Sequence, residues 1–170
     1  MLSVFCFDRL AVTVRDLYFV DPDPAPGQEG PERGVRVELR LVEPQPWRGS
    51  VYASQRIVVD TSLLRVDLFE SVERGPGSRD RVHHHPTMSG NEPGERVFDR
   101  TLTADPVGWL RERLGDPMAL LAAAGVADLP GFEESAAELV AALPYVVEAV
   151  DSSLARVRAG ELALTRTRGT

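Results

Sequence analysis

The sequence predicts an α+β fold, in which an antiparallel β-sheet from the N-terminal half is covered by helices from the C-terminal half. Residues 35–43 alternate apolar and charged side chains with a period of two, which is typical of a strand with one buried face. Strand-like patterns fill the first 72 residues, and helical patterns begin only at Asp105. Because the strands precede the helices without alternating with them, the sheet is expected to be antiparallel. A curled or barrel-like form of this sheet is compatible with the same pattern.

Strands are expected along most of this N-terminal half. They are rich in Val, Ile, Tyr and Leu and cover residues 2–7, 10–20, 35–43, 51–60 and 63–72. Asp60, Thr61 and Ser62 are typical of a tight turn between the last two strands. Residues 21–34 contain four Pro and three Gly, which disfavour both a helix and a central strand. We therefore expect a long hairpin loop there, and a loop of this length can act as a lid over a site.

The chain is long enough for one domain, and residues 1–170 divide into four stretches. These are a β-rich part, a loop-rich segment that carries the candidate site, a helical part and a tail: residues 1–72, 73–104, 105–160 and 161–170. Gly and Pro interrupt the loop-rich segment, which leaves room for short strands only, at 81–85 and 96–102.

The helical part carries clear start signals. Asp105 and Asp116 are each followed by proline, which predicts an N-cap aspartate with proline at the first helical position. A longer helix is expected from about 132 to 159, and Pro144 inside it predicts a kink or break. Its apolar residues recur at steps of three and four: Ala136, Val140, Leu143, Val147, Val150, Leu154 and Val157. Such a stripe packs on a sheet or on another helix.

Composition narrows the classes of function. Nineteen arginines and no lysines stand against 26 acidic residues, and the net charge of −7 disfavours a nucleic-acid partner. The lack of lysine excludes Schiff-base, PLP-linked and P-loop chemistry. Cys6 is the one cysteine, so an internal disulfide is excluded and a reducing, cytoplasmic location is expected. No signal-peptide pattern and no apolar run of about 20 residues is present, so no membrane partner is expected.

The three histidines of the chain are consecutive, at His83, His84 and His85. In an extended segment His83 and His85 share one face, and such a pair suits Zn or Fe. A third ligand is then needed, commonly a carboxylate. Asp67 lies on a preceding strand that can pair with the histidine segment as a hairpin, and Glu92 follows the histidines. We therefore predict a divalent metal held by His83, His85 and either Asp67 or Glu92.

Two other interpretations of this segment stay open. Without a metal, one histidine acts as the general base, and Arg65 or Arg96 holds an anionic group. In a purely structural role, the histidine run is a solvated strand end, and Arg65 forms an ion pair with Asp67. Asp99, which follows on the next segment, is a further carboxylate candidate.

The spacing of Gly77, His83 and His85, G-x5-H-x-H, resembles the start of the first metal motif of the cupins. Glu92 comes two or three residues later than a cupin glutamate, and no histidine remains for the second cupin motif. We therefore carry over no cupin fold or activity. The segments R-x-D-L-x-E, H-H-H-P and E-P-G-E-R-x-F-D resemble uncharacterised proteins of GC-rich actinomycetes, a resemblance that implies no activity.

These patterns favour a small cytoplasmic bacterial enzyme of a biosynthetic kind, which acts on a small molecule through a histidine-centred site. In the metal version the ion polarises the substrate or activates water. The rival class is a non-catalytic module that binds a protein partner or a ligand, through an exposed sheet edge or the long helix. A homodimer is compatible with both classes.

Overall fold

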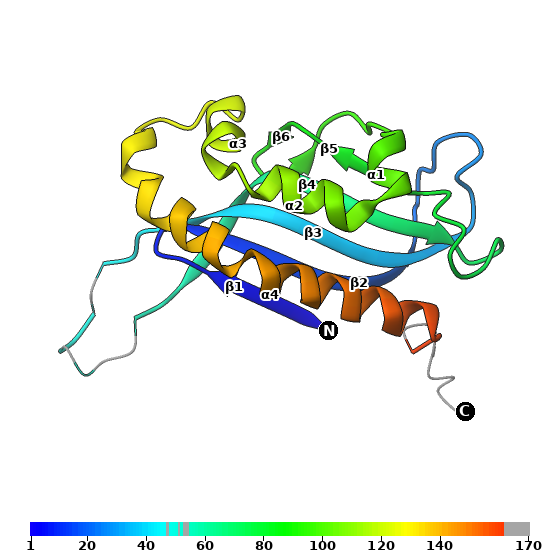
Figure 1. Cartoon of the computed structure of the whole chain (residues 1–170), viewed down its shortest axis with the longest axis horizontal. Helices are drawn as coiled ribbons and strands as arrows, with labels where there is room; N and C mark the ends of the chain where they lie inside the picture. The colour runs from blue at the N-terminus through cyan, green and yellow to red at the C-terminus, as the bar shows by residue number, and fades with distance from the viewer. Residues whose placement is uncertain (47, 51, 53–54, 162–170) are drawn as a thin grey trace.

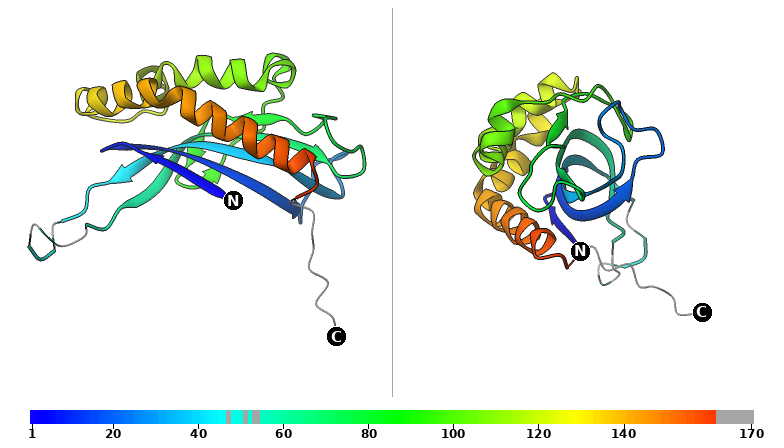
Figure 2. Two further views of the ribbon diagram at one scale, coloured as in Figure 1. Left: turned by 60° about the horizontal axis from the view of Figure 1, so that its bottom comes forward. Right: turned by 90° about the vertical axis from the view of Figure 1, so that its right-hand side faces the viewer.

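The computed structural model describes residues 1–46, 48–50, 52 and 55–161. One antiparallel sheet of five strands has the order β1-β2-β3-β4-β5 (Figure 1). The bounds of its strands are Leu2–Cys6, Leu10–Val20, Pro31–Glu43, Val58–Ser71 and His83–His85. β1 and β5 are the two edges, so the sheet curls without closing into a barrel (Figure 2). A small hairpin of β6, Met88–Ser89, and β7, Glu92–Pro93, follows β5.

The helices follow the sheet in the chain and cover one of its faces (Figure 2). In order, α1, α2, α3, the 3-10 helix η1 and α4 span Arg100–Ala104, Pro106–Leu114, Pro117–Ala123, Leu129–Phe132 and Glu133–Arg158. Asp105 caps α2 and Asp116 caps α3, each through a side-chain oxygen that accepts a backbone N–H, at 2.9 and 3.0 Å. The α+β class and both proline-led helix starts are therefore confirmed. No described helix has the length and apolar content that a bilayer crossing needs.

The core lies between the helices and the sheet face that they cover. Alternate residues of the central strands supply it, and their side chains are at most 1% exposed: Val12, Val14, Val35, Val37 and Val66. The stripe of α4 packs on β2 and β3 but differs from the expected one. Val140 is exposed, and Leu139 is fully buried in its place. Because neighbouring positions are both apolar here, the local pattern alone cannot choose between them. α4 also continues through Pro144 without a break.

Two strand predictions are wrong. The described residues 60–62 form no turn, because β4 runs unbroken from Val58 to Ser71. Its register against β3 shifts between Leu39 and Val42, so the sheet absorbs the irregularity as a bulge. The strand expected at 96–102 is also absent from this described stretch, where α1 begins at Arg100 instead. The early part of the strand expected at 51–60 includes residues outside the described ones.

The hairpin loop is shorter than expected. Residues 31–34 belong to β3, so the connection from β2 covers 21–30. This loop is tied to the segment around the histidines by side-chain contacts. Arg96 donates to Gln28 at 2.5 Å and to Asp21 at 2.7 Å, and Arg81 donates to the carbonyl of Gly27 at 2.6 Å. The loop therefore lies beside the candidate site.

The sheet face opposite the helices carries polar side chains in rows across the strands. In an antiparallel sheet, directly paired residues point to the same side. Two such rows cross β3, β4 and β5: Arg36, Asp67 and His83 in one, and Glu38, Arg65 and His85 in the other. The strand register therefore brings both outer histidines next to charged residues from two other strands.

Candidate functional site

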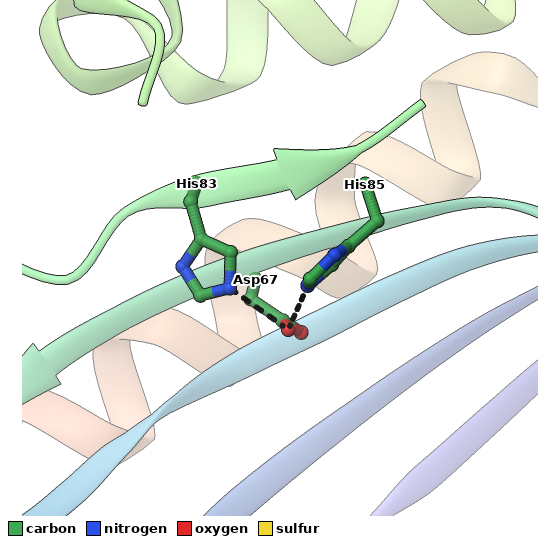
Figure 3. Close-up of side chains that lie close together, drawn as sticks. All are labelled: Asp67, His83 and His85. Atoms are coloured by element: carbon green, nitrogen blue, oxygen red, sulfur yellow. Dashed lines mark ion pairs between the residues drawn. The ribbon is translucent and has the colours of Figure 1, made fainter. Parts of the chain in front are cut away.

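Asp67, His83 and His85 lie together on the open face of the sheet (Figure 3). β5 pairs with β4 so that Asp67 stands directly opposite His83, and Arg65 opposite His85. This antiparallel pairing is the hairpin arrangement that the sequence allows for the two segments. His84 points to the other face, where its ring centroid lies 5.0 Å from that of Trp109.

The ligand atoms of this group converge on one point (Figure 3). The Nε2 atom of His83 lies 3.5 Å from Oδ2 of Asp67, and Nε2 of His85 lies 3.7 Å from the same oxygen. All three donor atoms lie within 4.8 Å of one another. Asp67 is 2% exposed and each histidine 4%, so the group is as buried as the core. The arrangement could hold a metal ion.

Backbone carbonyls set the orientation of both imidazole rings. Nδ1 of His83 lies 2.7 Å from the carbonyl oxygen of Arg81, and Nδ1 of His85 lies 2.9 Å from that of Gly94. A carbonyl oxygen only accepts hydrogen bonds, so each Nδ1 carries the proton that it donates. Each neutral ring therefore presents the lone pair of Nε2 to the shared carboxylate. A carbonyl that holds the second ring nitrogen is the usual support of a metal-bound histidine.

Burial favours the neutral form of both rings. Desolvation is the largest influence on the pKa of His83 and of His85, and it lowers both pKa values below the ordinary value. Asp67 opposes this shift at each ring, but the net direction remains downward. Two lone pairs and a carboxylate that face one another repel unless a positive charge lies between them. The distances from the Nε2 atoms of the two rings to Oδ2 of Asp67 are also longer than those of ordinary hydrogen bonds.

Arg36 holds the carboxylate of Asp67 in place. Its Nε donates to Oδ1 at 2.6 Å, and its second guanidinium nitrogen donates to Oδ2 at 3.1 Å. This bidentate contact fixes the plane of the carboxylate. It also directs Oδ2 toward the histidines, since that oxygen is the one closest to both rings.

The group lines a pocket of about 330 Å³ on the open face of the sheet. The other lining residues include charged and aromatic side chains and the β7 segment: Phe19, Asp21, Glu32, Arg36, Arg65, Phe69, Pro93, Gly94 and Arg96. Its volume falls in the range of small-molecule sites. Gly34 makes room for the wall of this pocket, because a Cβ there would lie only 2.6 Å from the Phe69 ring.

Several residues that the sequence suggests for the site have other partners or positions in the structure. Arg65 and Arg96 line the pocket, but each is already paired, Arg65 with Glu38 at 2.8 Å and Arg96 with the β2–β3 loop. Glu92, expected as an alternative ligand, is exposed on β7 and is not part of the ligand group. Asp99 caps α1 and accepts a hydrogen bond from the indole N–H of Trp109 at 3.0 Å. Of the carboxylates considered, the structure brings Asp67 alone into the described ligand group.

Sequence reasoning missed Arg36 and Glu32, which lie on β3. The signal was present, since Arg36 stands on the charged face of the alternating segment 35–43. Its partner could not be named, however, because the register between β3 and β4 joins residues 31 positions apart. Glu32 falls within the loop that the sequence predicts at 21–34, although it lies in β3, is 5% exposed and lines the pocket.

Comparisons with family models, with curated proteins and with solved structures find no match to this chain. A fold alone does not define an activity, so function has to be inferred from the chemistry of the site.

Proposed function

We propose that the protein is a metal-dependent enzyme that acts on a small molecule, with Zn²⁺ or Fe²⁺ held by Asp67, His83 and His85. The observation that carries this proposal is the use of both Nδ1 atoms by backbone carbonyls. That contact leaves two Nε2 lone pairs directed at one buried carboxylate oxygen. A divalent cation between them removes the repulsion and gives each ligand its ordinary role.

The distances support a site of this kind. A tetrahedral metal with bonds of about 2.1 Å holds its ligand atoms about 3.4 Å apart. The two Nε2 atoms lie 3.5 and 3.7 Å from Oδ2 of Asp67, so only small side-chain movements are needed. Three protein ligands from two adjacent strands occupy one side of the ion. The remaining positions face the pocket, as in catalytic rather than structural sites.

The chemistry follows from the open positions. A bound divalent ion polarises a substrate oxygen or lowers the pKa of a bound water. Arg36 keeps Asp67 in the orientation that the ion needs, and the carbonyls of Arg81 and Gly94 do the same for the histidines. The β2–β3 loop, tied to Arg96, contributes Asp21 to the lining of the pocket. The class of reaction is therefore metal-assisted conversion of a small molecule.

Elemental analysis of untagged protein tests the proposal. We expect one Zn²⁺ or Fe²⁺ per chain after anaerobic loading and desalting. His83→Gln, His85→Gln and Asp67→Asn should each weaken metal binding by about 10²-fold or more, because each removes a ligand. Glu92→Gln is the matched control, since it neutralises an exposed carboxylate of the same segment and should keep the metal.

Circular dichroism of each variant separates loss of the metal from loss of the fold. If folded wild-type protein takes up no stoichiometric metal under any loading condition, the proposal is wrong and Asp67 serves as a buried ion-pair partner. Equal metal retention in the three ligand variants and in the control would exclude this set of ligands.

A further inference from the structure

The pocket extends beyond the proposed metal ligands, and its remaining walls differ in character. One wall is aromatic. Phe19 and Phe69 meet edge to face with ring centroids 5.3 Å apart, and Phe69 in turn lies 6.4 Å from the ring of His83. Both phenylalanines line the pocket. A ligand that reaches from the metal into this pocket therefore places part of its body against aromatic surface.

The charged groups of the lining balance one another. Three carboxylates and three guanidinium groups face the pocket: Asp21, Glu32 and Asp67, and Arg36, Arg65 and Arg96. The imidazoles of His83 and His85 add no charge to the loaded site, because an imidazole that binds a metal is neutral. Behind the lining, Glu38 is paired with Arg40 at 2.7 Å as well as with Arg65. The protein groups that line the loaded site therefore sum to about zero charge before the metal itself is counted.

A divalent metal changes that balance. It adds two positive charges to a buried site in which the three lining carboxylates are already balanced by the three lining guanidinium groups. Because Asp67 and both histidines are almost completely withdrawn from water, this excess attracts an anion more strongly than it would at an exposed site. A negatively charged group on the ligand therefore completes both the coordination and the charge balance.

From these two features, and resting on the metal site proposed above, we infer that the pocket binds a small carboxylate with an apolar body. The carboxylate takes the open positions on the metal, and the body lies along Phe19, whose ring packs edge to face on the buried ring of Phe69. An aromatic or branched aliphatic carboxylic acid meets both requirements. A cationic ligand fails the first requirement even when it carries an apolar body, and a small hydrophilic anion meets only the first.

Protein loaded with Co²⁺ provides the test, because ligands that enter the coordination shell change its visible absorption. Four probes separate charge from apolar body: benzoate has both, acetate has the charge, benzyl alcohol has the ring, and benzylamine has the ring with the opposite charge. We expect benzoate to change the spectrum with a Kd at least about tenfold below those of the other three probes. Only benzoate combines the negative charge with the apolar ring.

A variant of the aromatic wall sharpens this test. Phe19 lies at the rim of the sheet and is only partly buried, so Phe19→Ala should leave the Co²⁺ stoichiometry unchanged and bring the benzoate Kd close to that of acetate. Tyr145→Ala, which removes an exposed aromatic side chain from α4, is the control and should keep the preference for benzoate.

The outcomes are distinct. If Co²⁺ binds but benzyl alcohol or benzylamine binds as tightly as benzoate, the anionic assignment is wrong. If acetate equals benzoate in the wild type, or if Phe19→Ala keeps the full preference, the apolar body is wrong. Both results leave the metal site intact, whereas protein that binds no Co²⁺ overturns the metal site and this inference together.

Discussion

Both faces of the sheet carry residues that are almost completely buried, but the means of burial are opposite. On the covered face, Val37 and Val66 are at most 1% exposed and contact other apolar side chains beneath the helices. On the open face, Asp67 and His83 are 2% and 4% exposed, yet they are surrounded by ion pairs and hydrogen bonds. Apolar burial is stabilising by itself, whereas a buried charge is tolerated only with its partners. The open face therefore has a cost that packing alone does not explain.

This difference is a reason to place the proposed site on the open face. A cluster of buried polar groups that could be replaced by apolar ones without loss of stability serves a purpose other than stability. The covered face should therefore respond to substitutions mainly through volume and polarity. The open face should respond through charge balance and through the proposed metal.

The largest effect is expected on the covered face. Leu139→Asp places an unpaired charge at a position with no exposed surface, and it should prevent stable folding. The neighbouring change Val140→Asp should be tolerated, because that side chain is 43% exposed. Thermal unfolding followed by circular dichroism checks both variants. A folded but monomeric Leu139→Asp protein from an oligomeric wild type would instead place this stripe at a subunit interface.

On the open face, Arg36→Ala should cost about 3 kcal/mol of unfolding free energy in metal-free protein, because it leaves Asp67 buried without its partner. Urea unfolding measures this loss. The double change Arg36→Leu with Asp67→Leu should recover much of it, since no unpaired charge remains. If the single variant is as stable as the wild type, the ion pair does not hold the open face together.

Added Zn²⁺ should stabilise the wild type by mass action, by about 2.7 kcal/mol at a free concentration of one hundred times Kd. The same addition should restore part of the stability of Arg36→Ala, because the ion also neutralises Asp67. His83→Gln should show only a small fraction of the wild-type gain, because its Kd is about 10²-fold higher, and Glu92→Gln should show all of it. A gain in His83→Gln equal to that of the wild type would place the ion elsewhere.

The smallest effect concerns the cap of α1. Hydrogen bonds from the hydroxyl and the backbone N–H of Thr101, together with the indole of Trp109, lower the pKa of Asp99 to about 2. A carboxyl with a lowered folded-state pKa contributes stability above its unfolded pKa near 4, and this contribution is lost as the pH falls toward 2. Asp99→Asn should therefore lower the thermal midpoint at neutral pH and flatten the decline between pH 4 and 2. A decline identical to that of the wild type would show that Asp99 is not its source.

Local patterns in the sequence determined much of the fold. The bounds of β2 agree with the predicted 10–20, since the alternation of side chains needs no information from elsewhere. α2 begins after Asp105 because an aspartate followed by proline is a complete start signal. The shared face of His83 and His85 also follows from the geometry of any extended segment.

Only the tertiary structure decided the features that depend on pairing between distant segments. Whether residues 60–62 turn or bulge depends on the strand beside them, and β3 holds them in the sheet. The choice of Asp67 over Glu92 depends on the register of β4 against β5, and the contact of Arg36 with Asp67 depends on that of β3 against β4. Register is set by how whole strands bury their apolar faces, so it is a property of the assembled sheet and not of any one segment.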